Sequence, residues 1–263
     1  MYPFTLDRPA TIADAAALSA AGATVLAGGQ TLLASMKLRL SNPGHLADLA
    51  GIKELSGIKR EGNAIVIGAM TRHRDVATST DVQALIPALA ELAAHIGDKQ
   101  VRAMGTIGGS VANNDPAACY PSALLALGAT VHTTQRQIAA ADFFQGMFAT
   151  ALNAGELITA VAFPVPKRAA YMKFNQPASR FALVGVFVAQ TGDGVRVAVT
   201  GAANGVFRHK GLEEALSKSF TAQAAAAVSI DATDLNHDIH ASAAYRANLI
   251  SVQTQRAVAK MLG

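Results

Sequence analysis

The chain has 263 residues, of which 51% are hydrophobic, and it carries a formal net charge of +4. This length is sufficient to bury a sizeable core and allows two domains. Because polar residues interrupt every long apolar stretch, no membrane-spanning helix is expected, and the scattered positive charges argue against nucleic-acid binding.

The residues that usually bind metals are too few or too dispersed for a metal site. Cys119 is the only cysteine, so the chain can form no internal disulfide and lacks the roughly four thiolates that an iron–sulfur cluster needs. His237 and His240 have no carboxylates converging on them in the sequence. The first residues do not resemble a signal peptide. We therefore expect a cytoplasmic protein without a metal site.

The N-terminal part predicts a small α/β unit of about 60 residues. The expected elements are helices over 12–20 and 31–40 and strands over 24–27 and 45–49. Asn42-Pro43-Gly44 is expected to end the second helix, because all three residues favour turns. The stretch over 51–62 is rich in turn formers.

A second unit begins where a continuous apolar run over 64–68 is typical of a buried strand. The elements expected after it are helices near 73–78, 84–95 and 121–127 and strands near 129–133 and 157–163. Pro164 and Pro166 then interrupt the pattern, because proline donates no ladder hydrogen bond and biases the preceding residue toward extended backbone. The expected domains are residues 1–165, with subdomains of about 1–60 and 61–165, and residues 166–263.

The C-terminal part predicts strands followed by helices. The expected elements are strands over 171–174, 181–190 and 195–202 and helices over 211–217, 222–228 and 243–262. Thr191-Gly192-Asp193-Gly194 lies between the last two strands and is a strong hairpin signal. The last helix has the spacing of an amphipathic face.

Two glycine-rich loops carry the clearest functional signal. Ala27-Gly28-Gly29-Gln30-Thr31 and Thr106-Ile107-Gly108-Gly109-Ser110 each precede a stretch that favours a helix. Paired glycines let the backbone turn its N–H groups toward a ligand, and a helix that begins there adds a positive dipole end. Neither G-x-G-x-x-G nor the P-loop pattern is present. One loop alone is equally explained by a simple turn, but the two together predict a pyrophosphate clamp, in which a side chain on Gly28 or Gly108 would displace the phosphate.

The residues that flank these loops belong to a series of motifs that covers nearly the whole chain. The segments that carry it are 27–33, 36–40, 67–71, 102–113, 142–146, 155–160, 171–174 and 177–182. In this order they resemble the FAD-binding medium subunit of the molybdenum hydroxylases, the family of aerobic carbon monoxide dehydrogenase and xanthine dehydrogenase. The resemblance implies an α+β fold. A two-subdomain, PCMH/VAO-like FAD-binding domain would precede a smaller C-terminal domain with an antiparallel sheet and helices.

The resemblance also implies which residues contact FAD. The two glycine-rich loops would hold the pyrophosphate, whereas positions outside them would contact the rest of the cofactor. The expected cofactor-binding residues are Leu26, Ala27, Gly28, Gly29, Gln30, Thr31, Leu32, Leu33, Ile96, Thr106, Ile107, Gly108, Gly109, Ser110, Cys119, Ile158, Lys173 and Phe181.

Two of these positions depart from the family pattern. Phe181 stands where carbon monoxide dehydrogenase has a tyrosine near the flavin, so the ring is kept and the hydroxyl is lost. Cys119 stands where the family usually has an acidic residue, and a thiol is a weak donor with little charge at pH 7. Either flavin orientation, potential or affinity differs from the family norm, or Cys119 only fills space and Asp115 or water covers the missing contact.

The function that the resemblance implies is electron transfer, which needs no acid or base from this chain, so no catalytic side chain is expected. Partner subunits would carry the other cofactors: a large subunit the molybdenum cofactor and a small subunit the 2Fe-2S clusters, in a dimer of heterotrimers. FAD on this chain would collect electrons and pass them to an external acceptor. The alternatives are a self-sufficient FAD-dependent oxidoreductase of a related fold and a scaffold subunit that has lost FAD.

Overall fold

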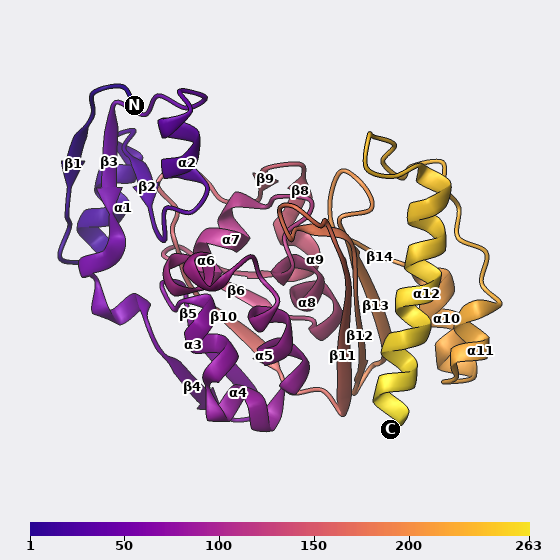
Figure 1. Ribbon diagram of the computed structural model, residues 1–263. Coiled ribbons are helices and arrows are strands. Elements are labelled where there is room, and N and C mark those ends of the chain that lie inside the picture. The colour runs from indigo at the N-terminus through magenta and orange to yellow at the C-terminus, as the bar shows by residue number, and fades with distance from the viewer.

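Three of the four β-sheets lie one after another along the molecule, and helices cover them (Figure 1). The computed structural model describes residues 1–263. The N-terminus lies beside the first sheet, and the last helix covers the third sheet at the other end of the row. None of the helices combines the length and the apolar character needed to cross a bilayer.

The first sheet is parallel, with the strand order β1-β3-β2, and confirms the predicted α/β unit. Its elements are β1 (Thr5–Asp7), α1 (Ile12–Ala20), β2 (Thr24–Leu26), α2 (Leu32–Lys37), β3 (His45–Asp48) and the 3₁₀ turns η1 (Leu49–Gly51) and η2 (Lys53–Leu55). The helix expected over 31–40 ends at Lys37. Arg39 adopts a left-handed φ of 60°, which a right-handed helix does not accommodate.

The second sheet is antiparallel and has the order β4-β5-β10-β6-β7. Its strands are β4 (Ile58–Glu61), β5 (Ala64–Gly68), β6 (Thr130–Thr133), β7 (Gln137–Ala139) and β10 (Ile158–Pro164). The helices of this unit are α3 (His73–Thr78), α4 (Thr80–Leu85), α5 (Pro87–Ala94), α6 (Lys99–Met104), α7 (Ile107–Asn113), α8 (Tyr120–Leu127) and α9 (Ala140–Phe143). A small ribbon of β8 (Phe144–Gly146) and β9 (Ala149–Thr150) follows α9. Up to this point of the chain the sequence prediction missed β1, β4, α6, β7, α9, β8 and β9. Of these, β4 is a short, mostly charged edge strand that lacks the apolar alternation of a typical strand.

The helix expected over 84–95 is divided into α4 and α5 at Pro87. Ile86 between them is not helical, with φ −139° and ψ 65°, and Pro87 is the first residue of α5. Proline disfavours helical backbone in the residue before it but fits the first turn of a helix. Pro87 therefore ends one helix and begins the next.

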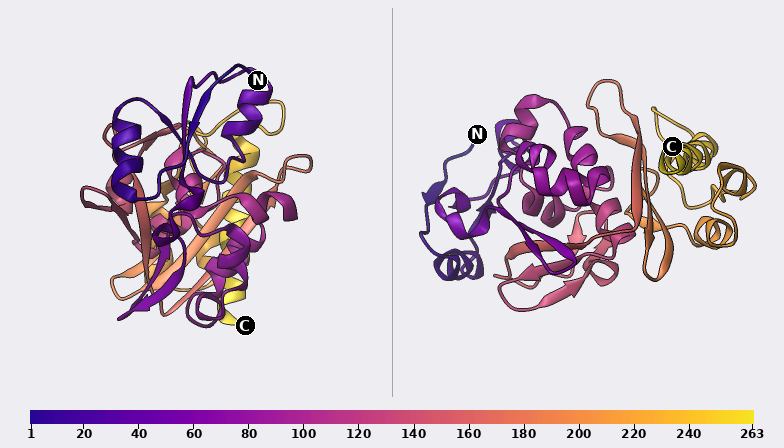
Figure 2. Two further views of the ribbon diagram at one scale, coloured as in Figure 1. Left: turned by 90° about the vertical axis from the view of Figure 1, so that its left-hand side faces the viewer. Right: turned by 90° about the horizontal axis from the view of Figure 1, so that it is seen from below.

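The third sheet is antiparallel, with its strands in chain order. Its strands are β11 (Arg168–Asn175), β12 (Ala182–Thr191), β13 (Gly194–Thr200) and β14 (Phe207–Arg208), and the helices after it are α10 (Lys210–Lys218), α11 (Ala222–Ala226) and α12 (Ala243–Leu262). Helices α5 and α8 pack on one face, and α10 and α12 pack on the other (Figure 2). The predicted hairpin joins β12 to β13, where Gly194 has a φ of 120°.

Helix α8 lies at the centre of the largest hydrophobic core. All of its residues are buried, as expected for a helix that is apolar on every side. The same core contains residues of the second sheet together with Tyr171, Phe187 and Ala198 of the third. The second and third sheets therefore share one core across residue 165.

Arg246 fastens helix α12 to the third sheet. Its Nη1 donates to the carbonyl oxygens of Leu183 at 2.9 Å and Gly201 at 3.0 Å, and its Nη2 donates to Asp238 Oδ2 at 2.6 Å. The side chain is only 4% exposed. These partners replace the water that Nη1 and Nη2 lose on burial, whereas the buried Nε has no partner.

Arg246→Met is expected to lower the free energy of unfolding by about 3 kcal/mol, because two backbone carbonyls and Asp238 lose their buried donor. Arg256→Met, at an exposed position of the same helix, is the matched control and should change stability by less than about 0.5 kcal/mol. Denaturant titration followed by circular dichroism measures both. Equal losses of unfolding free energy in the two variants would contradict the proposed role of Arg246 in holding α12 against the third sheet.

Candidate functional site

A cavity of about 680 Å³ lies between the first and second sheets. Its wall is formed by loop residues 27–32, by residues of the 105–110 and 152–158 segments, by Lys173 of β11, and by residues 179–181 of the connection between β11 and β12. This volume lies in the range of cavities that bind cofactors, and a boundary between units is a common place for them. The cavity is therefore the candidate functional site.

The first glycine-rich loop presents a row of unpaired backbone N–H groups. The N–H groups of residues 28–32 donate to no acceptor in the chain, and all of these residues line the cavity. Gly29 has a left-handed φ of 70° and bends the segment shortly before α2 begins at Leu32. Successive N–H groups in such a bend form a concave site for anionic oxygens.

The second glycine-rich segment differs, because its N–H groups already have partners. The N–H groups of residues 107, 108, 109 and 110 donate in turn to Thr71 O, Ala69 O, Thr106 Oγ1 and Thr106 O. Gly108 and Gly109 also belong to the first turn of α7 rather than to a loop before it. The sequence prediction of free N–H groups in both loops is wrong for this one. The hydroxyl groups of Thr106 and Ser110 are what this segment can present to a ligand.

The glycines Gly28 and Gly108 are required by packing within the protein. A Cβ on Gly28 would lie 2.8 Å from Gly105 Cα and closer still to the carbonyl oxygen of Met104. A Cβ on Gly108 would lie 2.7 Å from Ala69 O. Backbone atoms cannot give way as a flexible side chain can. The sequence prediction attributed this exclusion to a phosphate, and the structure attributes it to neighbouring backbone.

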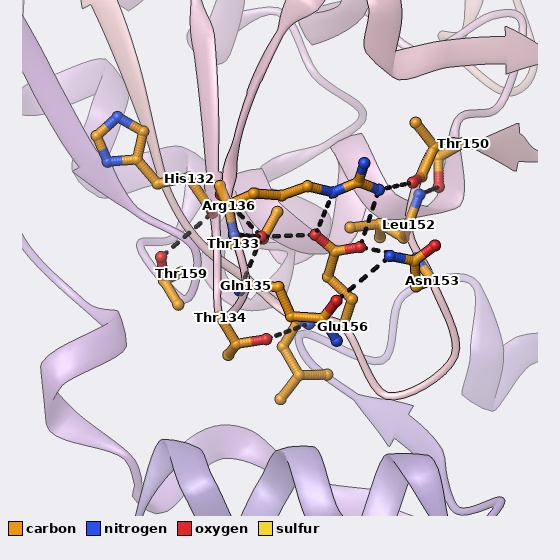
Figure 3. Close-up of polar contacts among 12 residues, drawn as sticks. His132, Thr133, Thr134, Gln135, Arg136, Thr150, Leu152, Asn153, Glu156 and Thr159 are labelled. Carbon is orange, nitrogen blue, oxygen red and sulfur yellow. Dashed lines mark hydrogen bonds and ion pairs between the residues drawn. The ribbon is translucent and has the colours of Figure 1, made fainter.

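Glu156 holds the loop before β10, which forms another part of the wall. Its buried carboxylate accepts from Arg136 Nε at 3.1 Å and Arg136 Nη2 at 3.2 Å. Thr133 Oγ1 donates to it at 2.7 Å, and the Asn153 N–H donates at 2.8 Å (Figure 3). With every oxygen engaged in structural contacts, Glu156 positions this loop and is not available as an acid or base.

Five of the expected contact residues come from outside the glycine-rich loops and also line the cavity: Ile96, Cys119, Ile158, Lys173 and Phe181. Ile96 follows α5, Ile158 begins β10, Lys173 lies in β11 and Phe181 precedes β12. Lys173 Nζ donates to His95 O at 2.9 Å. Phe181 is 46% exposed, so its ring lies where the cavity meets solvent.

Three of the expected contact residues do not line the cavity: Leu26, Leu33 and Ile107. Ile107 is fully buried in the largest core. Leu26 and Leu33 lie beside Gly29, and their Cδ1 atoms are 3.4 Å and 2.7 Å from where its Cβ would be. They therefore pack against Gly29 of the first loop without lining the cavity. The other expected loop and wall residues line the cavity: Ala27, Gly28, Gly29, Gln30, Thr31, Leu32, Thr106, Gly108, Gly109, Ser110 and Cys119.

Cys119 lies in the cavity wall directly before α8 and is 4% exposed. Two buried tyrosine hydroxyls, those of Tyr120 and Tyr171, have no hydrogen-bond partner. Burial raises the pKa of Tyr171, and the neighbouring Cys119 adds to this effect. Asp115 also lines the cavity, but its Oδ1 accepts from the Ala117 N–H at 2.8 Å. One oxygen of the Asp115 carboxylate is thus engaged in a local turn.

Sequence reasoning missed His73, which lines the cavity from the start of α3. The residue is 4% exposed. Burial, reinforced by the charge of Arg102, lowers the pKa of His73 to about 4, so the imidazole is neutral near pH 7. The only signal available in the sequence was its place two residues after the segment over 67–71.

The site combines unpaired N–H groups with apolar and aromatic walls. This combination is typical of sites that bind an organic cofactor with phosphate groups. Comparison with known proteins identifies the cofactor. Residues 2–166 match the family described as the FAD binding domain in molybdopterin dehydrogenase. The chain belongs to this family, and FAD is its cofactor.

Relatives and solved structures support the same assignment. The carbon monoxide dehydrogenase medium chain of Hydrogenophaga pseudoflava is 34% identical over 232 residues, which cover 82% of this chain and 81% of the relative. The carbon monoxide dehydrogenase medium chain of Afipia carboxidovorans is 38% identical over 159 residues, which cover 58% of this chain and 55% of that relative. This match thus spans about half the relative's length. The structure of reconstituted CO dehydrogenase from Oligotropha carboxidovorans superimposes with a TM-score of 0.91 at 35% identity, covering 99% of both chains. The expected family and α+β fold are confirmed.

The Glu156 network predicts a specific loss of stability in acid. The hydrogen bond from Arg136 is the main reason that the pKa of Glu156 is lowered from 4.5 to about 2. Because the folded state favours the ionised form, this contribution is complete above pH 4.5 and is lost as the pH falls toward 2. Glu156→Gln should lack this part of the pH dependence and be less stable at pH 7 by about 1–3 kcal/mol.

Unfolding midpoints measured between pH 7 and pH 2.5 test this expectation. Asp142→Asn replaces an exposed carboxylate that forms no ion pair and is the control, with the pH profile of the wild type. A Glu156→Gln profile parallel to that of the wild type would show that the network does not depend on charge.

Proposed function

We propose that FAD binds in this cavity with its pyrophosphate against the N–H groups of residues 28–32. The row of unpaired donors is the observation that carries the proposal, because successive backbone N–H groups that line a cavity form a concave site for anionic oxygens. Thr106 and Ser110 would add hydroxyl donors from α7. The apolar side chains of Ile96 and Ile158, the ring of Phe181 and the Lys173 side chain would contact the remainder of the cofactor.

We further propose that the chain is the electron-transfer subunit of a molybdenum- and iron–sulfur-containing dehydrogenase. When bound, FAD supplies the capacity to take up electrons from 2Fe-2S clusters and release them to an external acceptor. The residues of this chain bind and orient the cofactor and keep most of it from water. None of the cavity residues has the arrangement of a nucleophile with its base, and Glu156 is held in structural contacts.

The proposed partners are a large molybdopterin subunit and a small 2Fe-2S subunit, arranged as a dimer of heterotrimers. The names of the relatives support a multi-subunit assembly: one is a carbon monoxide dehydrogenase medium chain, and another is the 6-hydroxypseudooxynicotine dehydrogenase complex subunit alpha of Paenarthrobacter nicotinovorans, 34% identical over 237 residues. We also propose a cytoplasmic location and a division of the chain into domains of residues 1–165 and 166–263.

Gly29→Ala is expected to weaken FAD binding at least tenfold, because an L residue disfavours the left-handed backbone that aims the N–H groups. Gly22→Ala is the matched control: Gly22 has a φ of 96° in open space, away from the cavity. Both variants should lose about 1 kcal/mol of stability because the residue is left-handed. Gly29→Ala should lose somewhat more, because Leu33 Cδ1 lies 2.7 Å from the new Cβ and must shift, and only Gly29→Ala should lose affinity. Titration of the purified chain with FAD, followed by flavin fluorescence, measures the dissociation constants.

The wild-type titration separates the alternatives. Binding of one FAD per chain without substrate turnover in the absence of partners agrees with the proposed subunit. Turnover by the isolated chain would instead favour a self-sufficient oxidoreductase. Failure to bind FAD under any condition would favour the remaining alternative, a scaffold subunit that has lost FAD.

Cys119→Asp is expected to lower the reduction potential of the bound flavin, because a carboxylate in the cavity wall disfavours added negative charge nearby. Cys119→Ser keeps the size and neutrality of the side chain and should leave the potential near that of the wild type. Equilibrium dye titration of both variants measures the potentials. Unchanged potential and affinity in Cys119→Asp would show that Cys119 only fills space.

A further inference from the structure

His73 is held in the cavity wall by a short ladder of backbone hydrogen bonds. The His73 N–H donates to Gly105 O at 2.9 Å, and the segment over 69–71 accepts from Ile107 and Gly108 at 3.0 Å and 2.8 Å. A β-bridge between residues 72 and 106 completes this pairing. The imidazole is therefore fixed relative to the second glycine-rich segment.

The surroundings of the imidazole leave one ring nitrogen without any partner. Nδ1 is sealed from solvent and makes no hydrogen bond, whereas Nε2 is not sealed in this way. Gly105 leaves room for the ring, because a Cβ there would lie 2.6 Å from Nε2. The ring of Tyr120 packs on the imidazole with centroids 5.4 Å apart. The imidazole thus meets the cavity through the side that carries Nε2.

This arrangement determines where the single proton of the neutral ring resides. Protonation of Nδ1 would bury an N–H group without an acceptor, which is rarer in proteins than an unpaired acceptor. The proton therefore resides on Nε2. A neutral His73 presents a hydrogen-bond donor toward the cavity and buries an acceptor behind it.

We infer that His73 Nε2–H donates a hydrogen bond to the phosphate-bearing end of FAD. The inference rests on the proposed FAD site and adds a side chain to it. The position of His73 supports a contact with the phosphate end of FAD. Gly105 lies next to the His73 ring and also next to Gly28, where the row of unpaired N–H groups begins. A purely structural role is disfavoured, because an apolar side chain would fill the same space without an orphaned nitrogen.

Three variants of His73 test the assignment. His73→Leu removes the donor at similar volume, His73→Phe does so with a ring, and His73→Gln retains an N–H donor. The Leu and Phe variants should raise the dissociation constants for FAD and for ADP about tenfold, as expected for one lost hydrogen bond to a charged group. His73→Gln should retain most of the affinity. The apo-protein melting temperatures of the Leu and Phe variants should equal or exceed that of the wild type.

Gln253→Leu is the matched control. Gln253 is 1% exposed in α12, has an unpaired Oε1 and does not line the cavity, so its replacement should leave FAD affinity unchanged. Equal affinity of wild type and His73→Leu for FAD would overturn the inference while leaving the proposed function intact. A loss for FAD but not for ADP would overturn the phosphate-end contact. A wild type that binds no FAD would refute the proposed function itself.

Discussion

The close contact between Gly28 and the backbone of residues 104–105 is the constraint on which the site depends. A side chain at position 28 would collide with that backbone, so the first glycine-rich loop rests directly on the segment before α7. The pairing of residues 69–73 with residues 105–108 fixes that segment in turn. Backbone packing therefore sets the position of the first sheet relative to the second, and the cavity is the space left between them.

The two glycine-rich segments have different roles, although their sequences look alike. The first keeps the N–H groups of residues 28–32 unpaired and available for an anion. The second uses its N–H groups to hold α7 against residues 69–71 and to cap the helix. The binding loop is thus supported by a rigid neighbour, an arrangement that limits the entropy lost when a ligand binds. His73, held by the same pairing, extends this rigid support into the cavity.

Much of the fold was predictable because its signals are local. The bounds of α1, β5, α3 and α12 agree with the sequence prediction, since hydrophobic periodicity and capping residues act over a few positions. The prediction missed several short elements, among them β1 and β4, which are exposed or mostly charged, and it merged α4 with α5 across Pro87. Segments of this kind acquire their structure from strand pairing and packing rather than from their own pattern.

Motifs in a fixed order and local hydrophobic periodicity were enough to predict the family and the α+β fold, and they singled out the two glycine-rich segments as candidate cofactor-binding elements. The folded chain was needed to see which N–H groups are free, why Gly28 and Gly108 lack side chains, and that His73 reaches the cavity. Each of these depends on a partner from a distant part of the chain: the carbonyls of residues 69 and 71, the backbone of residues 104–105, and the space beside Gly105. Such partners are brought together only when the chain folds.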